Sequence, residues 1–278
     1  MSQVELRRGR FGRLLRSELA LVFRRRRNQA LLLVLAGPPI LIGIAVKITA
    51  PPPGAGPEFL GQVSGNGLFL IYTALTVCLP LFLPLAVGVV AGDSLAGEAS
   101  SGTLRYLLTL PISRSRLLLV KGLAVLAYAV AALAVVALSG LITGAILFGV
   151  HPLTLLSGDT VSVGSGLLRT AAIVGYVAFA LTGLVAMGLF VSTLTEVPIA
   201  AMATTVAATI IFEVLDAVPQ LGTSRQFLMT HDWLGFGEFL RLQVSVNQLL
   251  TWSSLQLAYV ALFASLAWAR FTSKDITS

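Results

Sequence analysis

Long apolar runs separated by short polar stretches dominate this chain. Six of these runs hold roughly 20 residues or more, enough to cross the ~30 Å hydrocarbon core of a bilayer as helices. We place them at about 29–49, 68–91, 117–150, 167–193, 197–215 and 249–269. The pattern therefore predicts an all-α integral membrane protein with six transmembrane helices.

A basic leader precedes the first run, and its apolar positions recur at helical spacing. They are Phe11, Leu14, Leu15, Leu19, Val22 and Phe23. Arginines surround this stripe, which is typical of an amphipathic helix at a membrane surface. We expect residues 1–28 to form this amphipathic helix. It would serve either as a topological anchor or as an elbow helix that braces a partner. Residues 29–270 form one transmembrane domain and residues 271–278 a tail.

Composition agrees with the membrane class, since 56% of residues are hydrophobic and only 11% are charged. The distribution of Lys and Arg sets the orientation. With a cytoplasmic N-terminus, nine lie before the first span, four lie between spans 2 and 3, and two follow span 6. Lys47, Arg169, Arg225 and Arg241 then lie outside. The positive-inside bias therefore favours a multi-pass protein of the cell membrane with both termini cytoplasmic.

One sizeable polar island interrupts the apolar spans, between Gly92 and Gly122. It carries Asp93, Glu98, Arg105, Arg114, Arg116 and Lys121. Such charges are costly in hydrocarbon, so we expect the island to face water. Asp93 and Ser94 are predicted to cap a short helix, Gly97 and Gly102 to interrupt it, and a second short helix to end before Pro111. Arg114 and Arg116 then lie in the first turn of span 3, where the helix dipole disfavours cations. Headgroup phosphates or an acidic partner surface would explain them.

The island also resembles the cytoplasmic loop of ABC-2-type transporter permeases. The residues that carry the resemblance are Gly97, Glu98, Gly102, Thr103, Leu104, Leu107, Leu108, Pro111, Ile112, Ser113, Arg114, Lys121 and Gly122. A basic elbow helix and six spans with this loop between spans 2 and 3 also match the family's layout.

This resemblance implies a transport subunit, an exporter in many members, driven by a separate ATPase. A coupling helix in the loop 92–116 would dock on that ATPase, through Glu98, Gly102, Thr103, Leu104, Leu107, Leu108, Pro111 and Arg114. The implied partners are two copies of an ATP-binding cassette subunit, a second permease copy or a related permease, and membrane lipids. ATP and Mg would be bound by the ATPase, with no cofactor in this chain.

Other chemistry is sparse in the sequence. No G-x4-G-K-[ST] segment occurs, so ATP hydrolysis would have to come from another polypeptide. Glu213 and Asp216 share a helix face near the outer boundary, and Arg169, Arg225 or Arg241 could balance them. Two histidines without regular spacing predict no metal site, and the arginine run abuts a span, so we expect no nucleic-acid partner. A membrane enzyme and a scaffold subunit without transport remain alternatives.

Overall fold

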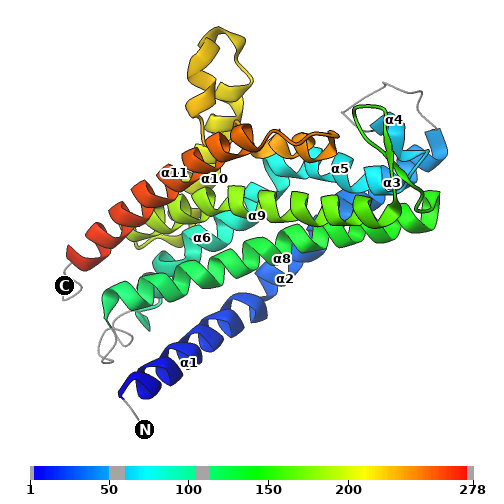
Figure 1. Ribbon diagram of the computed structural model, residues 1–278. Coiled ribbons are helices and arrows are strands. Elements are labelled where there is room, and N and C mark those ends of the chain that lie inside the picture. The colour runs from blue at the N-terminus through cyan, green and yellow to red at the C-terminus, as the bar shows by residue number, and fades with distance from the viewer. Residues whose placement is uncertain (1–2, 50–59, 104–112, 274–278) are drawn as a thin grey trace.

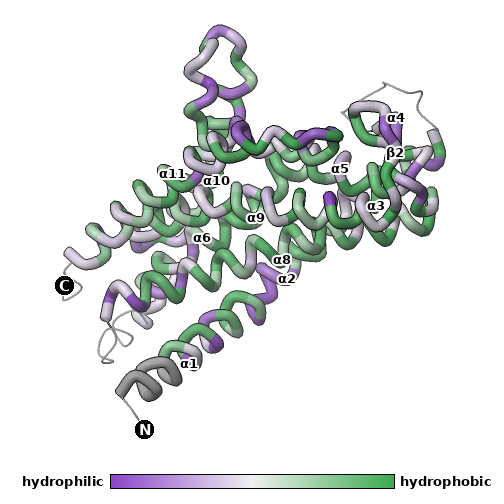
Figure 2. Tube along the Cα trace, viewed as in Figure 1, coloured by the Kyte–Doolittle hydropathy of each residue, from purple (hydrophilic) through white to green (hydrophobic). Residues whose placement is uncertain are grey.

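The computed structural model describes residues 3–49, 60–103 and 113–273. Within these residues the six predicted spans are all helical and apolar enough to cross a membrane. Figure 1 shows them as a bundle of long helices running in roughly one direction, with α1 (Gln3–Arg24) continuing away from one end. Figure 2 shows hydrophobic positions along the spans and hydrophilic ones gathered toward the ends and on α1. The prediction of an all-α membrane protein is confirmed.

The first two spans are each built from more than one helical segment. Span 1 consists of α2 (Arg26–Leu35) and α3 (Gly37–Thr49), which separate just before Pro38 and Pro39. Span 2 consists of α5 (Leu68–Val77), a π-helical turn η1 (Cys78–Phe82) and α6 (Leu83–Ser100). Pro80 lies inside the π turn. Because proline lacks the N–H of the regular ladder, the wider turn at this point has a local cause.

The other spans are single helices. They are α8 (Arg114–Phe148), α9 (Val163–Leu194), α10 (Pro198–Asp216) and α11 (Val246–Ser273). Two short elements lie at the opposite end of the bundle from α1: α4 (Leu60–Val63) and an antiparallel hairpin of β1 (Leu153–Thr154) and β2 (Thr160–Val161). The 3-10 helices η2 (Pro219–Phe227) and η3 (Trp233–Leu240) join α10 to α11, and in Figure 1 the yellow segment that follows α10 projects from the side of the bundle.

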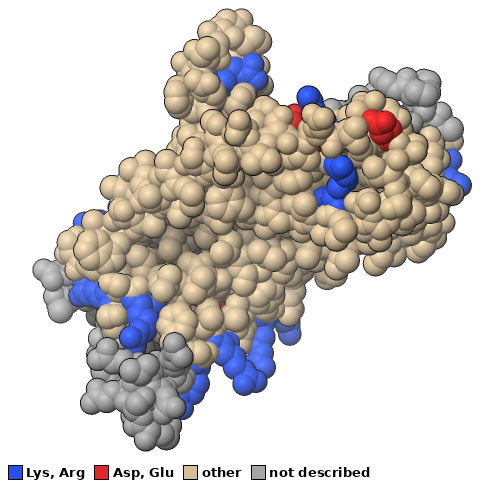
Figure 3. All heavy atoms as spheres, in the orientation of Figure 1, with Lys and Arg blue, Asp and Glu red and all other residues tan. Residues whose placement is uncertain are grey.

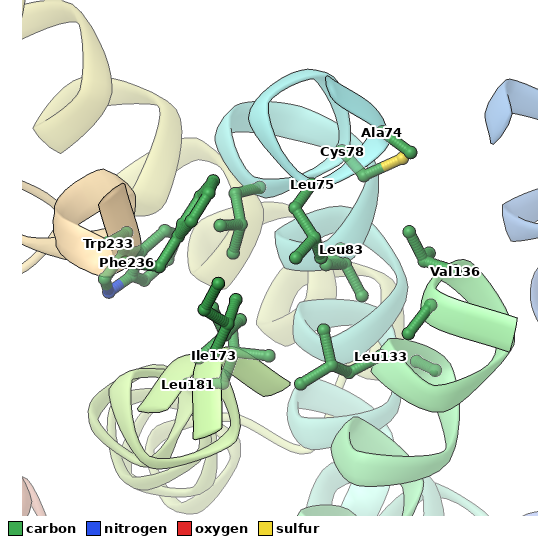
Figure 4. Close-up of a cluster of buried hydrophobic side chains, with 14 of the residues drawn as sticks. Ala74, Leu75, Cys78, Leu83, Leu133, Val136, Ile173, Leu181, Trp233 and Phe236 are labelled. Carbon is green, nitrogen blue, oxygen red and sulfur yellow. The ribbon is translucent and has the colours of Figure 1, made fainter. Parts of the chain in front are cut away.

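The spans differ in how deeply they are buried in the protein. In the most apolar stretch of α9, 67% of residues are buried, and in the most apolar stretch of span 2 the buried share is 61%. The corresponding shares are 17% for α10 and 6% for α11, so these helices present most of their side chains to the surroundings. Figure 4 shows the centre of the core, where Leu83, Leu133 and Ile173 from three helices meet Trp233 and Phe236 of η3.

The segment between α10 and α11 therefore contributes to the core rather than only covering it. Trp233 and Phe236 are almost fully buried. The Tyr176 hydroxyl donates to the Asp232 carbonyl oxygen, and Gln256 Nε2 donates to the Met229 carbonyl oxygen at 2.6 Å. These bonds tie the segment to α9 and α11.

Candidate functional site

The predicted coupling loop leaves the bundle at the end where α1 lies. Four of its predicted site residues, Leu104, Leu107, Leu108 and Pro111, lie outside the described residues, as does most of the predicted coupling helix. The structure does describe both ends of the loop, which carry Glu98, Gly102, Thr103 and Arg114.

Span 2 continues further into the polar island than the sequence predicted. We expected it to end near residue 91, but α6 runs to Ser100. Asp93 and Ser94 are therefore inside a helix and do not cap a new one, and Gly97 does not interrupt it. The Ser94 hydroxyl instead donates back to the Ala91 carbonyl oxygen at 2.7 Å.

The interruption occurs at Gly102. This residue has a φ of +71°, a left-handed conformation that favours glycine, and its N–H donates to the Ala99 carbonyl oxygen. The Thr103 hydroxyl returns to the Glu98 carbonyl oxygen at 3.2 Å. The helix end is thus fixed by the residues that the sequence pattern singled out.

Glu98 is buried rather than displayed on an exposed surface. Its Oε1 atom lies 2.6 Å from Lys121 Nζ, which also lies 3.1 Å from Glu18 Oε2. All three side chains are less than 10% exposed. Within the described part of the chain, Glu98 Oε2 has no hydrogen-bond partner. This triad joins α1, α6 and α8. Because an unpaired buried charge is strongly destabilising, the three helix positions depend on one another.

A second ion-pair group lies beside the triad. Asp93 accepts hydrogen bonds from Arg25 and from Arg27, whose Nη2 atom is 2.7 Å away. The two arginines flank the start of α2, so the junction between α1 and span 1 is held against α6. Arg25 and Arg27, from the arginine run that abuts span 1, thus bind a buried carboxylate within the chain.

Ser192 of α9 completes the attachment of this end of α6. Its hydroxyl accepts from the backbone N–H groups of Leu95 and Ala96 and donates to the Gly92 carbonyl oxygen at 2.6 Å. On the other side, a Cβ at Gly92 would lie 2.7 Å from the Met202 backbone nitrogen, so only glycine allows α10 to approach this closely.

Arg114, at the other end of the loop, has a partner that the sequence did not reveal. Its Nη1 atom donates to the carbonyl oxygens of Phe271 and Thr272, at 3.2 and 3.0 Å. These carbonyls belong to the last turn of α11, where the helix dipole is negative. Arg114 is thus unfavourably placed for the dipole of its own helix, α8, but favourably placed for the dipole of α11. Ser113 is the N-cap residue of α8, but its side chain makes no capping bond.

Sequence reasoning missed Glu18 and Ser192 altogether. For Glu18 a signal was present, because it lies four residues after Leu14 and three after Leu15 on the apolar stripe of the leader. An acid on that stripe needs a buried cation, which Lys121 supplies. Ser192 gave no comparable signal, since a hydroxyl residue in an apolar span is common.

Glu213 and Asp216, the acidic pair that the sequence singled out, do not share one set of partners. Asp216 Oδ1 lies 2.5 Å from His231 Nδ1 and 3.5 Å from Arg225 Nε, so Arg225 is one of the balancing cations that we expected. Arg169 instead donates to the carbonyl oxygens of Phe239 and Arg241. Glu213 is half-buried one turn before Asp216 on α10.

No part of the described chain brings together three or more His, Cys, Asp or Glu side chains that could hold a metal ion. The chemistry assembled at the α1 end of the bundle is thus one of ion pairs and helix attachments, which position a loop.

Comparison with known proteins agrees with this layout. The family described as ABC-2 family transporter protein matches residues 27–275, which includes all six spans and the loop. None of the curated proteins compared with the chain matches it. Since the match covers most of the sequence, the chain belongs to the ABC-2 family of transporter proteins.

Proposed function

We propose that this chain is the permease subunit of an ATP-binding cassette exporter in the cell membrane, and that a separate ATPase drives it through the loop 92–116. Family membership supports transport as the activity. The sequence holds no phosphate-binding G-x4-G-K-[ST] segment, so the ATP and Mg would be bound by the ATPase. A pair of permease chains with two ATPase subunits is the assembly that we infer.

The observation that carries this proposal is how firmly the two ends of the loop are anchored. On one side, Glu98 is held by Lys121 against α1 and α8. On the other side, Arg114 is bound to the end of α11. A push on the loop would therefore act on α1, α6, α8 and α11 together. A loop that only connected two spans would not need buried ion pairs at its base.

The proposal is tested by co-expressing the chain with an ATPase subunit from the same source and purifying through a tag on the permease. We expect the ATPase to co-purify and its hydrolysis in proteoliposomes to depend on the permease. Leu107→Asp should release the ATPase, because it would place an unpaired charge in the apolar docking surface.

Ser273→Asp is the matched control, since Ser273 is exposed at the same end of the bundle, on α11. It adds the same charge outside the loop and should leave co-purification unchanged. If Leu107→Asp retains the ATPase at the wild-type ratio and supports normal hydrolysis, the loop is not the docking element. If no ATPase binds to the wild-type chain, the scaffold alternative gains support.

A further inference from the structure

An apolar groove runs between α8, α9 and α11, away from the ion pairs at the base of the loop. Its volume is about 370 Å³. Figure 3 shows the face on which the surface is hollowed between α11 and α8. The groove is lined mainly by apolar side chains, among them Leu118, Leu123, Leu126, Ala186, Leu189 and Ala264.

The length of the groove matches one leaflet of a bilayer. On α8 its lining extends from Ser115 to Leu126, which is ~16 Å at 1.5 Å per residue. Half of a ~30 Å hydrocarbon core is ~15 Å. Because Ser115 is in the first turn of α8, the groove begins at the loop end of this helix and runs inward as far as Leu126.

Small residues create the hollow. Gly122 lies in the middle of the α8 lining, and a Cβ added there would reach Leu189 only at 3.5 Å, an ordinary contact. Ala264 lines the groove from α11 and is exposed. α11 packs closely along α9 but much less along α8, which leaves the groove open toward the surrounding lipid.

The end of the groove at the membrane surface is polar and cationic. The Trp268 indole donates to the Ser115 hydroxyl at 2.8 Å, an arrangement suited to the interface. Arg116 is half-exposed, and it lies three residues before Leu119 and seven before Leu123, so it borders the same side of α8. Arg114 is bound to the carbonyls of α11, which leaves Arg116 to meet an anion.

We propose that this groove binds an acyl chain of an anionic phospholipid, with the lipid phosphate beside Arg116. A chain of methylene groups fits an apolar groove one leaflet deep that opens to the bilayer, and a cation at its surface end favours a negative headgroup. The surface end of the groove lies at Ser115 and Arg116, the last residues of the loop 92–116, but the inference rests on the groove and not on ATPase docking, so it does not depend on the transport function.

Native mass spectrometry of the full-length protein tests the proposal. The protein is delipidated in mild detergent and then supplied with phosphatidylglycerol or phosphatidylcholine. We expect the wild type to retain one tightly held lipid per chain, with at least fivefold preference for phosphatidylglycerol. Ala264→Trp fills the groove and should lose this lipid. Gly122→Leu, which fills it from α8, should do the same.

Arg116→Gln should keep the lipid but lose the headgroup preference. Two variants serve as matched controls. Ala258→Trp adds the same bulk to an exposed site on α11 that is about 120° round the helix from Ala264, and Arg270→Gln removes a cation at the same end of the bundle. Both should behave as wild type.

Unchanged lipid retention in both Ala264→Trp and Gly122→Leu would overturn the proposal. Equal loss of preference in Arg116→Gln and Arg270→Gln would also overturn it, because it would assign the preference to general surface charge.

Discussion

Arg114, in the first turn of α8, donates a 3.0 Å hydrogen bond to the carbonyl oxygen of Thr272, in the last turn of α11. The two residues are 158 positions apart in the chain. The guanidinium thereby satisfies carbonyls that a helix end leaves unpaired, and it links the end of the predicted coupling loop to the last span.

We expect Arg114→Gln to lower the free energy of unfolding by about 1 kcal/mol, and with it the melting temperature of the purified protein. The variant loses the hydrogen bonds that a charged donor makes to two carbonyls at a partly exposed site. Arg114→Lys should recover only part of this, since one ammonium group cannot reproduce the guanidinium geometry. Fluorescence-detected thermal unfolding measures both. Ser113→Ala is the control and should change little, because the Ser113 side chain makes no capping bond. Equal melting temperatures for Arg114→Gln and wild type would assign Arg114 no structural role.

The orientation in the membrane is predicted from charge alone, and the structure identifies suitable positions to test it. Ser100 and Ser273 are exposed at the end of the bundle that carries α1, whereas Ser64 and Ser157 are exposed at the opposite end. With Cys78 replaced, single cysteines at Ser64 and Ser157 should react with an impermeant thiol reagent in intact cells, and those at Ser100 and Ser273 only after lysis. Labelling of position 273 in sealed cells would reverse the topology.

The fold was largely predictable because hydrophobic runs of this length leave few alternatives in a bilayer. The end of span 2 shows the limit of that reasoning. Asp93 and Glu98 read as the start of a water-facing loop, since a charge has no place in hydrocarbon. In the folded chain they lie in a helix because Arg25, Arg27 and Lys121, from other helices, pair with them. Pairing between distant residues is invisible to local hydropathy.

The site was less predictable than the fold for the same reason. The sequence identified Gly102 as an interruption because its effect is local to the backbone. It gave no indication that Arg114 would meet the end of α11, because that contact depends on how two distant spans pack. The role of Glu98 in coupling stays a prediction, with the new constraint that its carboxylate faces Lys121.

Asp232, between α10 and α11, is expected to make the stability of the protein depend on pH. Burial raises the pKa of its carboxyl from 3.8 to about 6; nearby His231 lowers it, while Asp216 raises it. A folded-state pKa above the unfolded value means that the folded protein binds the proton more tightly. The charged form therefore costs stability above pH 6, and stability is regained as the pH falls from 6 toward 4.

We expect Asp232→Asn to raise the melting temperature at pH 8 and to have little effect at pH 4.5, where the wild-type carboxyl is largely protonated. The difference in unfolding free energy at pH 8 should be at most about 3 kcal/mol, from 1.36 kcal/mol per pKa unit. Asp159→Asn is a suitable control because Asp159 is exposed in the β1–β2 loop. A melting-temperature increase of the same size at both pH values would show that the amide acts through something other than charge.

The Glu18–Lys121–Glu98 triad should respond very differently to partial and complete replacement. Lys121→Met leaves two buried carboxylates without a cation, a change that typically costs about 3–5 kcal/mol, and we expect most of the protein to aggregate on extraction. Replacing the whole triad, as Glu18→Leu, Lys121→Met and Glu98→Leu together, removes all three of its charges and should restore a monodisperse protein, because apolar residues of similar size can substitute for a buried ion group.

Size-exclusion chromatography of fluorescent fusions measures the folded yield of each variant. The folded triple variant then distinguishes a role of the ion group in stability from a role in coupling to the ATPase. If the ion group serves only to hold α1, α6 and α8 together, the triple variant should retain ATPase co-purification and permease-dependent hydrolysis. If Glu98 also transmits the movement of the loop, the triple variant should assemble but show weakened hydrolysis in proteoliposomes. A triple variant that aggregates as much as Lys121→Met would contradict the assignment of the defect to unpaired charge.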